Sequence, residues 1–139
     1  VLANIIDMTI FLNPTSDSYR RFGHSKAPRY VSWSSENRSQ LIRIPAAEGE
    51  YRRAELRSPD PLCNPYLAFA LIIRAGLDGL RQGLTLPPAA DINLYTAPRY
   101  ITAGYRPLAE TREAACEAAR SSAFIAGCLP ESIIKSYTS

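Results

Sequence analysis

The chain of 139 residues is poor in histidine and cysteine. His24 is its only histidine, so a metal site with two imidazole ligands cannot be built from this chain alone. The three cysteines, Cys63, Cys116 and Cys128, are odd in number and far apart, which fits neither a disulfide framework nor a zinc-ligand spacing. We therefore expect a reducing, cytoplasmic location, and we expect any metal to bind mainly through carboxylates.

Long apolar runs and a strong excess of charge are also absent. Arg74 interrupts the apolar run 67–73, so no stretch reaches the roughly 18 residues of a membrane-spanning helix. Residues 1–12 are apolar but lack a basic leader and contain Asp7, which favours the end of a helix or a buried strand over a secretory signal. The net charge of +3, without a dense basic block, argues against a nucleic-acid partner.

Lysine is scarce as well. Only Lys26 and Lys135 are present, so arginine carries nearly all the positive charge. The planar guanidinium group binds carboxylate and phosphate through two hydrogen bonds at once. A genomic preference for arginine codons would explain the ratio equally well, so the positions of individual arginines must decide.

Three strands are predicted in the first half of the chain. Strand-forming residues occupy 28–33, 40–44 and 52–58, and turn-forming or proline-containing segments separate them. The order predicts an antiparallel meander. Along the third strand, Arg53, Glu55 and Arg57 share one face because side chains alternate. Taken alone, this row is most simply a solvated surface with Glu55 paired between two arginines.

Helices are predicted in the second half. Asn64 can cap a helix that has Pro65 in its first turn and that Gly83 can end. Its interior glycines, Gly76 and Gly79, suggest close packing against another backbone, and we expect the helix to lie on the sheet. After a connection over 84–95, a helix is expected over 109–120, with shorter segments after 121 and 130.

The fold class is therefore α+β, an antiparallel sheet with helices packed on one face. Residues 1–83 form its site-bearing part and 84–139 a mostly helical appendage.

Five ordered motifs carry a resemblance to a known family. They are Asn13-Pro14-Thr15 with Ser18-Tyr19-Arg20-Arg21, Asn37-Arg38-Ser39 with Ile42-Arg43-Ile44-Pro45, Arg53-Ala54-Glu55-Leu56-Arg57-Ser58-Pro59-Asp60-Pro61, Asn64-Pro65-Tyr66-Leu67-Ala68, and Ala75-Gly76-Leu77-Asp78-Gly79. In this order they resemble the bacterial-type glutamine synthetases, in the C-terminal part of the catalytic domain. The match is weaker from Leu84 onward.

The resemblance implies an ATP-dependent ligase. Such enzymes transfer the ATP γ-phosphate to glutamate and let ammonia attack the resulting acyl phosphate, with Mg²⁺ or Mn²⁺ bound and with subunits assembled in homo-oligomeric rings. It implies a metal-ligand role for Glu55 and a catalytic role for Arg38 at the transferred phosphate and the substrate. It also implies glutamate binding by Arg21, Arg38 and Arg57, and ATP binding by Arg38, Arg43 and Arg53. In this context the face of Arg53, Glu55 and Arg57 is interpreted as lining the site.

One loop departs from the family pattern. Between Arg21 and Ala27, where many members have a glutamate that helps to deprotonate ammonium, this chain has Lys26. Either another carboxylate does that work, or a larger amine is the substrate, or the protein does not complete the reaction. His24 is more simply a solvated loop residue than a base, and Tyr95, which resembles a tyrosine adenylylated in some members, more simply a packing residue.

The family's other metal ligands precede the part represented here. We therefore expect this chain alone to be inactive. Three hypotheses remain open at this point: a fragment of a glutamate–ammonia ligase, a fragment of a ligase for a larger amine, and a non-catalytic assembly module.

Overall fold

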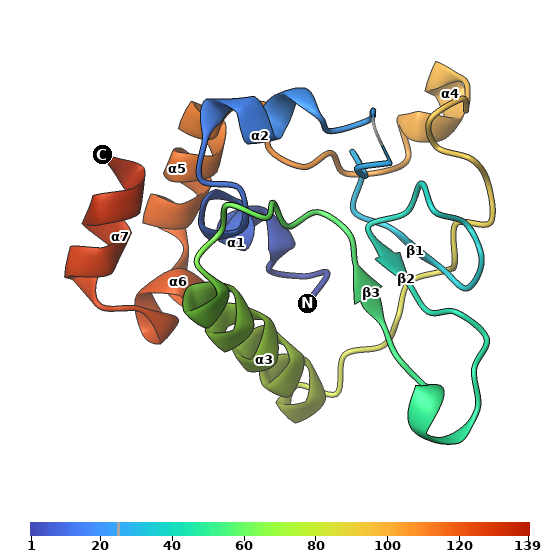
Figure 1. Cartoon of the computed structure of the whole chain (residues 1–139), viewed down its shortest axis with the longest axis horizontal. Helices are drawn as coiled ribbons and strands as arrows, with labels where there is room; N and C mark the ends of the chain where they lie inside the picture. Colours follow the sequence, from blue (N-terminus) through green and yellow to red (C-terminus); the bar gives the residue numbers. More distant parts are fainter. Residues whose placement is uncertain (25) are drawn as a thin grey trace. The chain divides into compact units, whose positions relative to one another are not determined.

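Figure 1 shows the computed structural model of the chain, which describes residues 1–24 and 26–139. Its elements are α1 (Ile5–Leu12), α2 (Ser16–Arg20), β1 (Trp33–Ser34), β2 (Ile42–Arg43), the 3-10 turn η1 (Gly49–Tyr51), β3 (Glu55–Leu56), α3 (Pro65–Arg81), α4 (Arg99–Thr102), α5 (Arg112–Ser121), α6 (Ala123–Cys128) and α7 (Glu131–Thr138).

The chain divides into two compact units that alternate along the sequence. Unit 1 comprises Val1–Arg20, Pro59–Thr85 and Ala109–Ser139, and unit 2 comprises Arg21–Ser58 and Leu86–Leu108. Each unit draws on separate stretches of the sequence, and the division into a site-bearing part, residues 1–83, and a mostly helical part, residues 84–139, stays a prediction.

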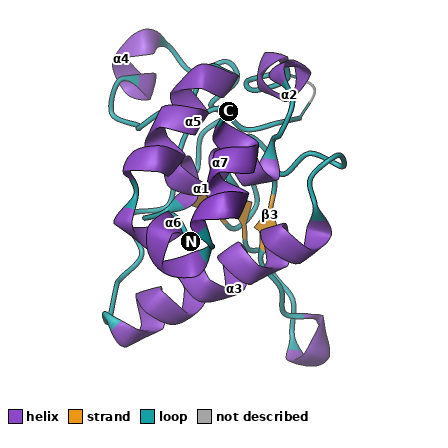
Figure 2. Cartoon of the chain, turned by 90° about the vertical axis from the view of Figure 1, so that its left-hand side faces the viewer, coloured by secondary structure: helices purple, strands orange, loops and turns teal. Residues whose placement is uncertain are grey.

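Helix α1 lies at the centre of unit 1, where it contacts α3, α5, α6 and α7 (Figure 2). The side chains of Ile5, Met8, Ile10, Phe11 and Leu12 are at most 1% exposed. A helix that is apolar over most of its surface is stable only when it is surrounded by other elements. Of the two interpretations of the apolar start, the helix is therefore correct.

Helix α3 begins and ends where the sequence predicts. Asn64 Oδ1 accepts hydrogen bonds from the backbone N–H groups of Tyr66 (2.9 Å) and Leu67 (3.4 Å), and Pro65 occupies the first turn. Gly83 follows the helix with φ of +61°, a conformation that favours glycine. Within unit 1 the helix packs against α1, and its predicted packing on the sheet stays a prediction.

The explanation offered for two glycines in α3 is wrong. A Cβ atom built at Gly76 or Gly79 meets no atom of the described residues within 4 Å. Close backbone contact therefore does not require glycine at these positions in this chain.

The three C-terminal helices are confirmed. Thr111 caps α5 by accepting a hydrogen bond from Ala114 N–H at 3.2 Å. Ser122 caps α6, and its hydroxyl donates to Asp7 Oδ2 at 2.6 Å, which ties α6 to α1. Two short helices were not predicted: α2 lies where turn-forming residues suggested a loop, and α4 lies between the connection over 84–95 and the helix expected over 109–120. Both have at most five residues, too few for a helical period to be recognised.

The sheet of unit 2 is mixed, so the prediction of an antiparallel sheet is only half correct. β2 pairs antiparallel with β3, but β1 pairs parallel with β2, with Trp33 opposite Ile42. A parallel pair requires a connection that returns the chain to the starting end of the sheet. Residues 35–41 suffice for this return because each strand is only two residues long. The α+β class itself is confirmed.

No helix in the described part of the chain is long and apolar enough to cross a membrane. All three cysteines are free thiols.

Candidate active site

Glu55 lies between two arginines in unit 2. β3 places Glu55 directly opposite Arg43 of β2, and residues opposite each other in an antiparallel pair project on the same face. Arg43 Nη1 lies 3.2 Å from Glu55 Oε2 and 3.4 Å from Oε1. Arg53, two residues before Glu55, donates its Nε–H to Oε1 at 3.2 Å, as strand alternation predicts for that pair. One carboxylate thus receives hydrogen bonds from two cations.

These contacts keep Glu55 ionised. Partial burial opposes ionisation and raises its pKa, but the hydrogen bonds and charges of Arg43 and then Arg53 outweigh that effect, so the pKa is lowered from its ordinary value. The side chain of Arg43 is 20% exposed and that of Arg53 is 54% exposed. Arg43 is therefore the better shielded partner.

Arg57 follows β3, and only one of its two terminal guanidinium nitrogens is hydrogen-bonded within the described residues. Its Nη2 donates to the Lys26 carbonyl at 3.1 Å. Its Nη1 is buried and has no hydrogen-bond partner among the described residues. A buried donor without an acceptor is costly, and an anionic ligand or a water would satisfy it. The guanidinium group can therefore receive an anion.

Arg21 is hydrogen-bonded to the segment that follows β3. Its Nη2 donates to the backbone carbonyl of Ser58, the residue after Arg57. Its guanidinium carbon lies 5.5 Å from the centre of the Phe22 ring, within cation–π range. Through Ser58, the structure brings Arg21 and the end of β3 together.

Arg38 is not part of this cluster of contacts. It is exposed, and its guanidinium makes no hydrogen bond or ion pair with any described residue. Its backbone carbonyl accepts a hydrogen bond from the Tyr95 hydroxyl at 3.4 Å. Burial raises the pKa of Tyr95, so this hydroxyl stays protonated and can donate. The Arg38 guanidinium is therefore exposed to solvent, while the Tyr95 hydroxyl holds the backbone that carries it.

The loop that departs from the family pattern forms a tight turn at its described positions. The His24 backbone N–H donates to Arg21 O at 2.9 Å, and its carbonyl accepts from Ala27 N–H at 2.8 Å. Lys26 is exposed and has φ of +65°, a conformation uncommon outside glycine. Ser25, between them, lies outside the described residues.

Glu55 is the only residue that the sequence predicts as a ligand of a divalent metal. The described residues contain no group of three histidine, cysteine or acidic side chains that could surround an ion. Glu55 is a hard oxygen donor of the kind Mg²⁺ and Mn²⁺ prefer, but both its oxygens contact arginines. The donor type fits such an ion, while the number of donors does not complete its coordination.

Several polar residues around Arg38 were missed from the sequence. Gln40 and Ser34 are fully buried, and Ser34 hydrogen-bonds Asp91 across 57 residues. A polar residue inside a predicted strand, such as Gln40, is the one sign that could have indicated a buried network. No local sequence pattern indicates that Asp91 is the hydrogen-bond partner of Ser34.

Comparison with known proteins gives consistent matches. The family model described as "Glutamine synthetase, catalytic domain" matches residues 1–139. The glutamine synthetase of Methanosarcina mazei is 40% identical over 141 residues, which cover 99% of this chain and 31% of that protein. The glutamine synthetase of Thermotoga maritima is 54% identical over 85 residues, covering 60% of this chain and 19% of that protein.

A solved structure extends the similarity to the fold. It is described as "GmaS/ADP complex-Conformation 1", has 28% sequence identity and a TM-score of 0.83, and is matched over 99% of this chain and 32% of its own. The chain thus spans about a third of these proteins' length. With a family model matched from the first residue to the last, the chain belongs to the glutamine synthetase catalytic-domain family.

Proposed function

We propose that this chain is the C-terminal part of the catalytic domain of an ATP-dependent glutamate–ammonia ligase that acts through γ-glutamyl phosphate. The observation that carries the proposal is Glu55, held ionised between Arg43 and Arg53 on adjacent strands. Family membership supports the reaction class. The cytoplasm as location and a homo-oligomeric ring as assembly are part of the same proposal.

The arginines supply positioning and charge. Phosphoryl transfer to a carboxylate needs little covalent help from the protein, but it needs neutralisation of the charge on the phosphoryl oxygens. Arg43 and Arg53 face the ATP phosphates, and Arg38 reaches the transferred phosphoryl group and the substrate. Arg21 and Arg57 hold glutamate together with Arg38. The unpartnered, buried Nη1 of Arg57 supports its role, because a substrate carboxylate would satisfy that donor.

Glu55 is the ligand this chain offers to Mg²⁺ or Mn²⁺. When bound, such an ion neutralises charge on the nucleotide phosphates. Arg43 and Arg53 keep the Glu55 carboxylate deprotonated and oriented. The remaining ligands come from other parts of the proposed enzyme, since the described residues offer no further cluster.

A hybrid enzyme tests the proposal. Residues 1–139 replace the matching segment of the Methanosarcina mazei glutamine synthetase, which they match over 99% of the chain. We expect the hybrid to release phosphate from ATP with glutamate and ammonium, and Glu55→Gln to lower the rate about 100-fold, since about 2.7 kcal/mol of transition-state stabilisation corresponds to that factor. Glu131→Gln is the matched control, because that carboxylate is 79% exposed on α7. A correctly assembled hybrid without activity would contradict the proposal.

The isolated chain tests whether this protein is instead a non-catalytic assembly module. With one metal ligand, we expect the chain alone to release no phosphate and to bind ATP only weakly, with or without Mg²⁺. Titration calorimetry measures this binding. Tight, magnesium-dependent binding of ATP by the chain alone would rule out the module and would also show that the single ligand suffices.

A ligase for a larger amine is the second candidate, and Lys26 favours it. The exposed ammonium group stands where many members of the family have a glutamate, and a cation neither attracts ammonium nor accepts its proton. A screen of amines with the hybrid separates the two candidates. A clear preference for ammonia eliminates the larger amine, and Lys26→Glu should then increase the use of ammonium.

A further inference from the structure

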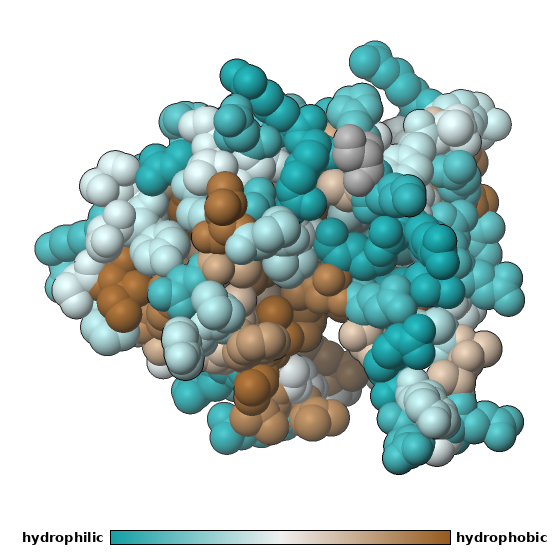
Figure 3. Space-filling view, in the orientation of Figure 1, coloured by the Kyte–Doolittle hydropathy of each residue, from teal (hydrophilic) through white to brown (hydrophobic). Residues whose placement is uncertain are grey.

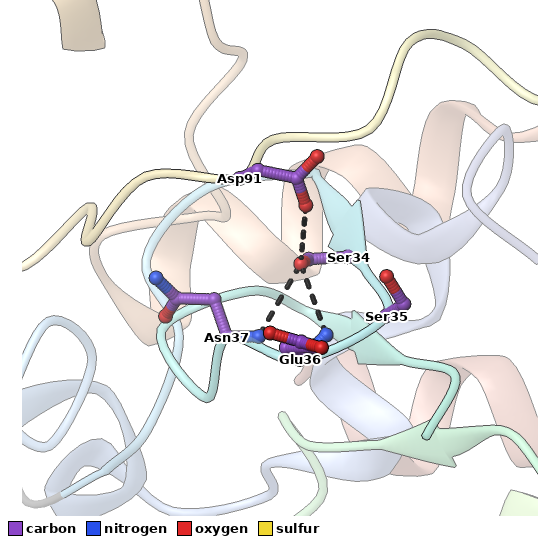
Figure 4. Close-up of a pocket in the computed structure, with 5 residues that line it drawn as sticks. All are labelled: Ser34, Ser35, Glu36, Asn37 and Asp91. Carbon is purple, nitrogen blue, oxygen red and sulfur yellow. Dashed lines mark hydrogen bonds between the residues drawn. The ribbon is translucent and has the colours of Figure 1, made fainter. Parts of the chain in front are cut away.

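Ser34 connects Asp91 to the loop between β1 and β2, which carries Arg38. The buried Ser34 hydroxyl donates to Asp91 Oδ1 at 2.9 Å and accepts from the backbone N–H groups of Glu36 and Asn37, both at 3.3 Å. Figure 4 shows Ser34 between the Asp91 carboxylate and these two nitrogens. The bond to an ionised carboxylate is stronger than a bond between neutral groups, so it fixes the hydroxyl in the orientation that accepts both N–H groups.

Asn37 and Ser39, on either side of Arg38, form a second connection to residues 90–94. Asn37 Oδ1 accepts from the Ser39 backbone N–H at 2.9 Å and from the Ser39 hydroxyl at 2.8 Å. The Ser39 oxygen in turn accepts from Leu94 N–H at 2.9 Å. Arg38 therefore lies between two residues whose side chains are bonded to each other.

Gln40 attaches the end of the loop. Its side chain is fully buried, and its Nε2 donates to the carbonyls of Ala90 (2.6 Å) and Ile92 (2.7 Å). Its Oε1 accepts from the Ser32 hydroxyl at 2.7 Å. A buried amide with all these bonds made tolerates little displacement. Residues 90–94 thus hold the Arg38 loop at its start, middle and end.

We infer that Asp91 is a positioning residue for Arg38. Through Ser34 it orders the backbone of residues 35–37, and this order places the Arg38 guanidinium, which no described side chain holds directly. The inference rests on the proposed function, because Arg38 acts on the phosphoryl group there. Asp91 touches neither substrate nor nucleotide in this role.

Amide hydrogen exchange of the whole 139-residue chain tests the ordering. We expect Asp91→Ala to increase the amide exchange rate of residues 36–39 about tenfold. Losing one hydrogen bond to a charged group weakens the ordered state by enough to produce a change of that size. Ser34→Ala should do at least as much, because it removes the acceptor of both N–H groups. Asp91→Asn, which keeps an acceptor oxygen, should stay within about threefold of the unsubstituted chain. Glu48→Ala, an exposed carboxylate of the same unit, should leave this segment unchanged.

A double-variant cycle in the hybrid enzyme tests the action through Arg38. We expect Asp91→Ala to lower kcat about tenfold with a smaller change in the KM for ATP. In Arg38→Ala the same substitution should have no further effect, because the group that Asp91 positions is gone. Unchanged exchange in Asp91→Ala, or losses that add in the double variant, would overturn the inference. If no hybrid is active, the proposed function fails, and exchange alone then decides whether Asp91 orders the loop.

Discussion

At the residue scale, Glu55 is the point where opposing electrostatic effects meet. Partial burial raises its pKa, and the two arginines lower it by more. Arg43 approaches both carboxylate oxygens from the facing strand, whereas Arg53 approaches one and is more exposed. Screening by solvent weakens the contribution of the more exposed partner.

The two arginines should therefore contribute unequally. We expect Arg43→Gln to raise the pKa of Glu55 more than Arg53→Gln does. Titration of the carboxyl carbon of Glu55 by nuclear magnetic resonance measures both shifts. Equal shifts would mean that exposure does not separate the two partners.

The same carboxylate predicts a dependence of stability on pH. Because the pKa of Glu55 is lower in the folded chain than in the unfolded chain, ionised Glu55 stabilises the fold above the unfolded pKa. That contribution is lost as the pH falls through the folded pKa. We expect Glu55→Gln to destabilise the chain at neutral pH, with the difference shrinking at acidic pH.

Urea unfolding at several pH values checks this. Glu131→Gln is the control, because its pKa is lowered by the Lys135 hydrogen bond and charge, but the pair lies on the surface of α7 and should contribute little. A Glu55→Gln difference that does not change with pH would contradict the assignment.

At the element scale, α3 is defined by local chemistry at both ends and weakened in its middle. Asn64 caps the helix and Gly83 ends it with a positive φ, while Gly76 and Gly79 have open space around them. Glycine inside a helix loses more backbone entropy on folding than alanine does.

Alanine at the interior positions should therefore stabilise the chain. We expect Gly76→Ala and Gly79→Ala each to raise the free energy of unfolding by about 0.5–1 kcal/mol. Gly83→Ala is the matched control and should destabilise, because alanine is strained at φ of +61°. Denaturant unfolding measures all three. A loss of stability at Gly76 or Gly79 would mean that their surroundings are filled.

The elements also separate what local patterns predict from what they do not. The cap and stop of α3 depend on residues within three or four positions, so the sequence predicts them. The parallel pairing of β1 with β2 depends on how residues 35–41 return the chain. That path is set by bonds to residues 90–94, fifty or more positions away.

At the scale of the whole molecule, one apolar face of α3 is exposed in the part of the chain that the structure describes. Tyr66 is 85% exposed and Leu80 is 80% exposed, with Phe69, Ile73 and Leu77 between them at helical spacing. Figure 3 shows hydrophobic side chains gathered over this helix. Contiguous apolar surface of this kind favours association.

We therefore expect the isolated chain to self-associate as its concentration rises. Phe69→Ser with Ile73→Ser should reduce association without lowering stability, because both side chains are already exposed to water. Leu71→Ser, at a fully buried position of the same helix, should instead destabilise the fold. Sedimentation velocity and thermal unfolding distinguish these results. A chain that stays monomeric at high concentration would contradict the prediction.

The sequence by itself determined the family, the α+β class, the main helices and the shared side of Arg53 and Glu55. These follow from ordered motifs, from capping residues and from the period of two along a strand, all of which act over short distances. The tertiary structure decided the mixed sheet, the pairing of Arg43 with Glu55, and the connection of Asp91 to the Arg38 loop. Those features join residues that lie from 9 to 57 positions apart, beyond the reach of capping and strand alternation, so only the folded molecule selects one partner among many.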